Sequence, residues 1–171
     1  LPAGRLGDRI GHGRIMVIGI VVQGLAFVWC SLASSFEFFL LARVSQGASM
    51  ALILGTAPAL VTLSVSERHQ PRALGIFAMT TAAGLAAGAP VGGLLLQAWD
   101  WQSVYAFRVP YMGVLLVAAL LSGLHRPGVM KSKQPLDLFG AMTLALGLGL
   151  TLFVASRGLM WGWTSPTTIA L

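Results

Sequence analysis

The residue best placed to do chemistry is an arginine inside an otherwise uncharged apolar segment. Arg43 is followed at i+3 and i+4 by Gln46 and Gly47, so on a helix one face would carry a guanidinium, an amide and a notch. If the segment begins near Phe38, Arg43 lies roughly 8 Å below the edge of the hydrocarbon. A cation at that depth normally faces a water-filled cavity, although an arginine can also snorkel to the interface. The pattern favours a cavity served by Arg43 and Gln46.

Small residues recur at i+4 spacing in a later apolar segment, where they would let another helix approach closely. The glycines of this strip are Gly84, Gly88, Gly92 and Gly93. Pro90 lies among them and removes one helix hydrogen bond, which kinks a helix. Gly47 begins a shorter strip of the same kind. The long strip is either a packing surface alone or part of a pliable helix at a moving interface.

The first fourteen residues combine glycine with charge. The glycines, Gly4, Gly7, Gly11 and Gly13, permit tight turns and close backbone approach. Asp8 can pair with Arg9 or Arg14, or can cap a neighbouring helix N-terminus. Such contacts can hold one conformation and release in another. The alternative is a basic anchor without a gating role.

Other chemistry is poorly supported. The lone cysteine, Cys30, cannot build a disulfide or a Cys/His metal site within this chain. No Ser/His/Asp set or phosphate-binding loop is present, so the sequence indicates neither an enzyme nor a cofactor or metal site. Arg108 is most simply an interfacial anchor. The histidines fall in separate polar segments and are expected to be solvated: His12, His69 and His125.

The elements that position these residues are long apolar segments. They are Ile15–Ser35, Phe38–Val65, Ala73–Trp99, Val109–Leu124 and Leu138–Ser156. Most approach or exceed the roughly 20 residues needed to cross a bilayer, and a lone span satisfies its backbone in lipid only as a helix. Charged residues are only 9% of the chain, against about 25% in soluble domains. The sequence therefore predicts an all-α polytopic membrane protein whose first partner is the lipid bilayer.

The basic residues give the expected orientation. Connections rich in Lys and Arg alternate with poor ones, and the rich connections, at residues 1–14, 64–72 and 125–136, should be cytoplasmic. Tryptophan and tyrosine gather at the opposite ends, as interfacial aromatics do. Because the +6 net charge is divided among loops, nucleic acid is not an expected partner.

Three motifs resemble those of the major facilitator superfamily. Gly4–Arg14 resembles the G-x-L-x-D-R-x-G-x-x-R loop between its second and third helices, and Arg43–Gly47 resembles the R-x-x-Q-G motif of its fourth helix. Gly84–Gly93 resembles the antiporter motif G-x-x-x-G-P-x-x-G-G of its fifth helix. Here Ala89 holds the usual place of the proline and Pro90 follows it.

The resemblance implies a partial major-facilitator helical bundle and an internal fragment of a longer chain. Residues 1–14 would be the cytoplasmic signature loop, and residues 15–124 helices three to six of the N-terminal bundle. Residues 125–136 would be a cytoplasmic linker. Residues 137–171, which are similar to the extra central helices of fourteen-helix drug:proton antiporters, would hold the first such helix and the start of the next. The remaining helices of the full-length chain are then expected partners.

The same resemblance implies proton-driven export of amphipathic or cationic compounds by alternating access, with protons and a small molecule as partners. Arg43 and Gln46 would take part in proton coupling. The residues implied in the cytoplasmic gate are Gly4, Asp8, Arg9, Gly11 and Arg14. The displaced Pro90 keeps a metabolite symporter of the same fold as an alternative. A third possibility is a scaffold or sensor in the cell membrane that transports nothing.

Overall fold

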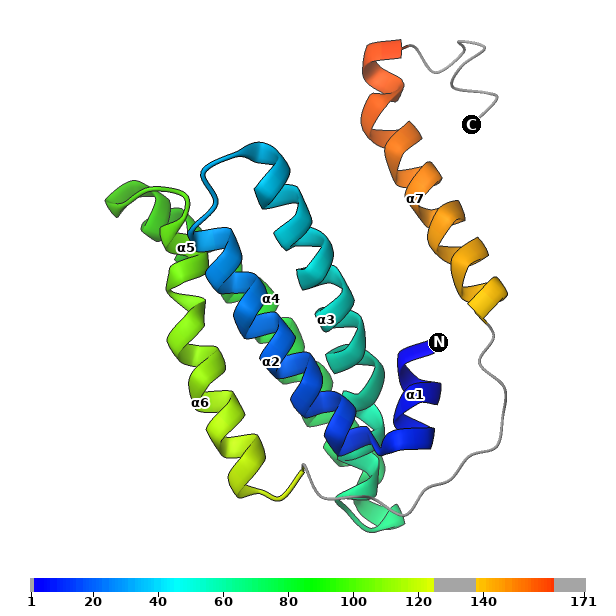
Figure 1. Ribbon diagram of the computed structural model, residues 1–171. Coiled ribbons are helices and arrows are strands. Elements are labelled where there is room, and N and C mark those ends of the chain that lie inside the picture. The colour runs from blue at the N-terminus through cyan, green and yellow to red at the C-terminus, as the bar shows by residue number, and fades with distance from the viewer. Residues whose placement is uncertain (1, 125–137, 162–171) are drawn as a thin grey trace. The chain divides into compact units, whose positions relative to one another are not determined.

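The structure is a computed structural model that describes residues 2–124 and 138–161. The chain divides into two compact units, of which one comprises residues 3–133 and the other residues 134–171 with the first two residues. Every regular element in the described residues is a helix (Figure 1). This confirms the all-α fold class. The predicted linker at 125–136 and the residues after Trp161 lie outside the described residues.

The helices of the larger unit follow the apolar segments to within about one helical turn. They are α1 (Pro2–Ile10), α2 (His12–Ser31), α3 (Phe36–Leu63), the 3₁₀ helix η1 (Glu67–His69), α4 (Gln70–Ala98), α5 (Ser103–Ala106) and α6 (Arg108–Leu121). Four stretches among the described residues are long and apolar enough to cross a membrane: α2, α3, η1 with α4, and α5 with α6. The smaller unit contains α7 (Leu138–Trp161).

Local chemistry fixes where these helices begin. Ser35 is extended, and its side-chain oxygen accepts a hydrogen bond of 3.3 Å from the backbone N–H of Phe38, which caps the start of α3. Proline stands in the first turn of α4, where its missing N–H costs nothing. Gly11 separates α1 from α2 with φ of 106°, a conformation that favours glycine.

The beginning of the chain differs from the expected loop, because residues 2–10 form α1. Glycine lowers the intrinsic helix propensity of this segment, but packing against the rest of the unit compensates. A Cβ at Gly4 would lie 3.4 Å from the carbonyl oxygen of Gly55 on α3, and Gly7 is buried beside His12. Tertiary contact thus stabilises a helix that the local composition does not favour.

The core of the larger unit lies around α2, which packs against α3 and α6 (Figure 1). The contact with α3 depends on small residues, since a Cβ at Gly19 would lie only 2.8 Å from Cγ1 of Ile53. Ala26 and Cys30 of α2 and Ala42 of α3 are also buried. Small side chains therefore allow α2 and α3 to approach closely, as helices do in membranes.

Helix α4 is different, because none of its residues is buried. Nothing lies within 4 Å of a Cβ placed at Gly84, Gly88, Gly92 or Gly93. Gly47 of α3 is equally open. Pro90 lies within the continuous helix. The close helix contact predicted for these positions is not made within the described residues, and it stays a prediction for the full-length protein.

Candidate functional site

Arg43 lies in the third turn of α3 and makes the contact that its spacing predicts. Its Nη1 donates a hydrogen bond of 2.7 Å to Oε1 of Gln46, three residues later. Its guanidinium carbon also lies 5.9 Å from the centre of the Phe39 ring and 6.0 Å from that of Tyr105. These distances suit cation–π attraction. The side chain is held between an amide and two aromatic rings.

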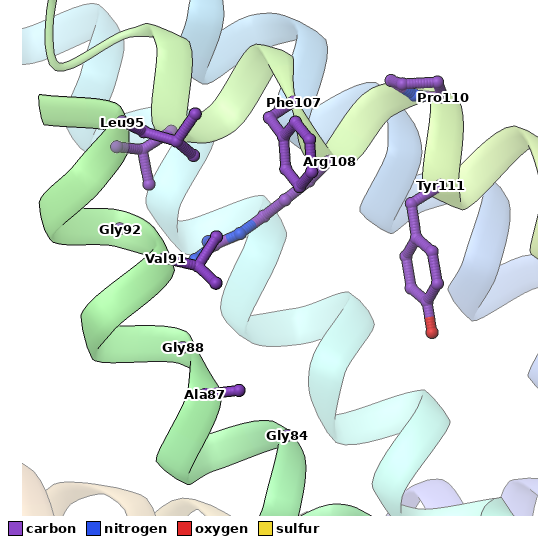
Figure 2. A pocket seen from close by; sticks show the side chains of 11 residues that line it. Gly84, Ala87, Gly88, Val91, Gly92, Leu95, Phe107, Arg108, Pro110 and Tyr111 are labelled. Atoms are coloured by element: carbon purple, nitrogen blue, oxygen red, sulfur yellow. The ribbon is translucent and has the colours of Figure 1, made fainter. Parts of the chain in front are cut away.

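Arg108, predicted to be an interfacial anchor, is the second cation of the site. Its guanidinium carbon lies 5.5 Å from the ring centre of Phe27 and 5.9 Å from that of Tyr105. Figure 2 shows the side chain extending from α6 towards α4. The short helix α5 ends at Ala106, two residues before Arg108, which begins α6.

Both arginines line one cavity of about 1200 Å³ between α2, α3, α4 and α6. Its charged and amide side chains are Gln23, Arg43, Gln46 and Arg108. Most of the remaining wall is aliphatic, aromatic or methionine. A large apolar cavity with a few convergent polar groups is the usual form of a small-molecule site. The location of Arg43 and Gln46 in this wall agrees with the cavity expected from sequence.

Sequence reasoning missed a buried polar pair, of which one member, Gln23, belongs to this wall. Ser49 is 0% exposed and Gln23 4% exposed, and the Ser49 hydroxyl is within hydrogen-bond distance of Gln23 Oε1. The same hydroxyl is 2.8 Å from the carbonyl oxygen of Gln46. The pair ties α2 to the turn of α3 that carries Gln46. An amide in the middle of the first apolar segment was the available signal, because polar groups in lipid need partners.

A smaller cavity of about 540 Å³ follows the glycine strip of α4 (Figure 2). Gly84, Gly88 and Gly92 line it from α4, and Arg108 and Tyr111 line it from α6. Arg108 and Gly84 also line the larger cavity, so the two spaces share part of their walls. Most of the predicted α4 motif therefore faces open space beside the candidate site.

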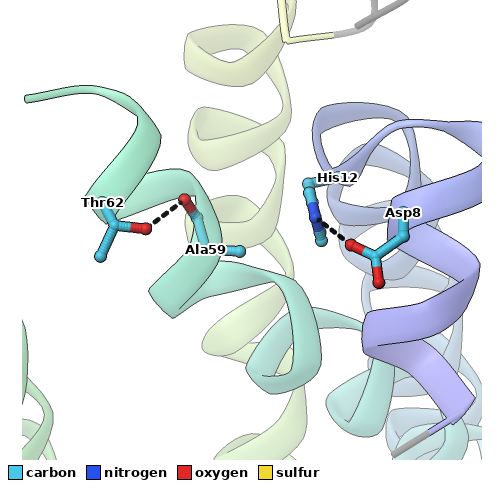
Figure 3. Close-up of polar contacts among 4 residues, drawn as sticks. All are labelled: Asp8, His12, Ala59 and Thr62. Atoms are coloured by element: carbon cyan, nitrogen blue, oxygen red, sulfur yellow. Dashed lines mark hydrogen bonds and ion pairs between the residues drawn. The ribbon is translucent and has the colours of Figure 1, made fainter. Parts of the chain in front are cut away.

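The candidate gate residues lie together on α1 and the start of α2. An oxygen of Asp8 lies 2.9 Å from Nε2 of His12 (Figure 3). His12 is only 8% exposed, so the expectation of a solvated histidine is wrong. Gly7 makes the burial possible, because a Cβ there would collide with the imidazole. Gly11 supplies the turn, whereas Arg9 and Arg14 are exposed.

The fold defines a multi-pass helical membrane protein, and its helices enclose a large, mainly apolar cavity. The chain belongs to the Major Facilitator Superfamily, whose family model matches residues 1–171. This confirms the resemblance seen in the motifs.

Several relatives carry names that refer to drug resistance. The chain is 30% identical over 172 residues to multidrug resistance protein Stp of Mycobacterium tuberculosis, covering 100% of this chain and 32% of the relative. It is 29% identical to the methylenomycin A resistance protein of Bacillus subtilis, covering 99% of this chain and 36% of that protein. It is 31% identical to the methyl viologen resistance protein SmvA of Salmonella typhimurium, covering 93% of this chain and 32% of that protein. The chain thus spans about a third of the length of these relatives.

Proposed function

We propose that the full-length protein is a proton-driven secondary transporter that exports amphipathic or cationic compounds by alternating access. The observation that carries this proposal is the Arg43–Gln46 pair in the wall of a large, mainly apolar cavity. Relatives named for resistance to several different compounds support it. An apolar wall accepts many amphipathic bodies, whereas a few polar groups set orientation.

Each predicted group has a role in this proposal. Arg43, fixed by Gln46, would control the protonation of a carboxylate in the remaining helices, since a nearby cation lowers the pKa of an acid. Asp8 and the arginines near it would stabilise the closed state at the cytoplasmic face, which the positive-inside rule assigns to this end. The unburied α4 would supply a surface that packs differently in the two states of the transport cycle.

The test is transport by the full-length protein in everted membrane vesicles. A fluorescent cationic amphiphile should move against an imposed proton gradient, and Arg43→Ala should slow this movement by about tenfold or shift its pH dependence. Arg72→Ala is the matched control, because Arg72 is exposed near the start of α4, away from the cavity. Wild-type rates and an unchanged pH profile in Arg43→Ala would remove the coupling role.

A metabolite symporter is the second candidate, and the position of Pro90 favours it. The proline follows the usual place in the antiporter motif by one residue, so the α4 helix loses a different backbone hydrogen bond. The direction of substrate movement under an imposed pH gradient separates the two candidates. A symporter moves its substrate with protons, whereas an exporter of the proposed kind moves it against them.

A further inference from the structure

We propose that Arg43 and Arg108, which both line the large cavity, together bind one anionic oxygen-acid group, such as a carboxylate. The inference builds on the proposed function by naming the chemistry that the cavity accepts. Its new element is Arg108, which lines the cavity together with Arg43.

The first step is the placement of the two guanidinium groups. They come from α3 and α6, yet both lie against the ring of Tyr105, at 6.0 Å for Arg43 and 5.9 Å for Arg108. Each is held on a second ring as well, Phe39 for Arg43 and Phe27 for Arg108. The aromatic faces hold these side chains without using N–H donors, and Arg43 donates from Nη1 to Gln46. The pair is therefore oriented before any ligand arrives.

The second step is their charge balance. The chain has five acidic residues, and none of those in the described part forms an ion pair with Arg43 or Arg108. One of the five, Asp8 on α1, lies 2.9 Å from His12 at the start of α2. Two like charges facing a mainly apolar cavity are costly, and one anion between them removes the repulsion and supplies two attractions.

The third step is the kind of anion. A guanidinium presents a planar fork of donors that matches the two oxygens of a carboxylate, and two such forks can share one oxygen-acid group. Much of the rest of the cavity wall is apolar, and it includes Met16, Met50 and Met112, whose flexible side chains adapt to different shapes. The site thus fits an acid carried on an apolar body.

Such an acid has two possible sources, an amphipathic acidic substrate or a carboxylate side chain on the remaining helices. Both present the same chemistry to Arg43 and Arg108. They differ in what they predict for an added ligand, because a side chain that already occupies the site leaves no room for a second anion.

The experiment measures binding of naphthaleneacetic acid and its neutral amide to the purified full-length protein in detergent by calorimetry. If the substrate supplies the acid, the wild type should bind the acid about tenfold more tightly than the amide, and R108Q should abolish that preference while R108K keeps part of it. R72Q is the control and should retain the preference.

If a side chain supplies the acid, the wild type shows no preference for the added acid. In that case R108Q should raise the pH midpoint of proton binding by the purified protein in detergent by about one unit relative to R72Q, because losing a cation raises the pKa of the paired carboxylate. The inference is overturned if R108Q matches R72Q in both the acid-to-amide ratio and the pH midpoint. Should R108Q not fold, R108K carries the same comparison, since a lysine keeps the charge but loses the fork and should lower the ratio severalfold or move the midpoint.

Binding in detergent needs no proton gradient, so this result stands apart from the proposed function. A protein that prefers the acid but fails to move substrate against protons would refute proton-driven export and leave the anion site intact. A protein that moves substrate against protons but shows neither the acid preference nor the pH shift would refute the anion site and leave proton-driven export intact.

Discussion

At the scale of single residues, the Ser49 hydroxyl holds the wall of the cavity together. It is buried between two acceptors, Gln23 Oε1 on α2 and the Gln46 carbonyl oxygen on its own helix. A hydroxyl has one proton, so it donates to one of them at a time. Because Gln46 also receives the hydrogen bond from Arg43, this buried pair supports the turn that positions the cation.

Replacing this hydroxyl should therefore cost stability. Ser49→Ala leaves a buried amide oxygen without its donor, which we expect to lower the free energy of unfolding by about 1–3 kcal/mol. The control is Thr80→Ala on α4, whose exposed hydroxyl donates 2.9 Å back to the Ile76 carbonyl and whose loss should change little. Thermal unfolding of the full-length protein in detergent measures both. Equal melting temperatures for the two variants would contradict a structural role for Ser49.

At the scale of helices, the seam between α2 and α3 limits the size of the side chains in it. A Cβ at Gly19 would approach Ile53 Cγ1 at 2.8 Å and the Ser49 carbonyl oxygen at 3.3 Å. Further along the same helix, a Cβ at Gly24 would make an ordinary contact of 3.5 Å with Met112. Helix α2 therefore has one glycine, Gly19, where an added methyl group would be too close to its neighbours, and one, Gly24, where it would fit.

The two glycines make a matched pair of substitutions. Gly19→Ala should separate α2 from α3 and destabilise the protein by about 1–3 kcal/mol, because overpacking forces the neighbours to move. Gly24→Ala should be neutral or slightly stabilising, since alanine is the better helix former. The melting temperatures of the two variants in detergent measure this difference in stability. If Gly19→Ala is as stable as Gly24→Ala, the close contact described for the seam is incorrect.

Sequence predicted the helices better than it predicted the site. Apolar length alone located α2, α3, α4 and α6, since few structures satisfy the backbone in lipid. Spacing within one helix also predicted the contact between Arg43 and Gln46. Helix α1 was missed because its stability comes from packing rather than composition.

The features of the site that sequence missed involve residues on different helices. Arg108 begins α6, whereas one of its partner rings, Phe27, lies on α2. The pair formed by Gln23 and Ser49 joins residues 26 positions apart. Local periodicity carries no information about which helices meet, so neither arrangement could be derived from the pattern.

At the scale of the whole molecule, the described helices form part of a larger bundle. The chain spans about a third of the length of its relatives, and α4 has no buried residue among those described. The family match and the four long apolar stretches define a multi-pass membrane protein. The sidedness of its loops remains our prediction from the positions of Lys and Arg. Every role proposed for the gate and the cavity assumes that the residues before α4 and those after it lie on opposite sides of the membrane.

The most direct measurement is the accessibility of single cysteines in a cysteine-free version of the full-length protein, in intact cells. Ser66→Cys lies just before η1, and Trp99→Cys just after α4, and both positions are exposed. A membrane-impermeant maleimide added outside should label Trp99→Cys and should label Ser66→Cys only after the cells are permeabilised. Equal labelling of both positions in intact cells would contradict the claim that α4 spans the bilayer. The proposed transport function, which depends on that claim, would then also be wrong.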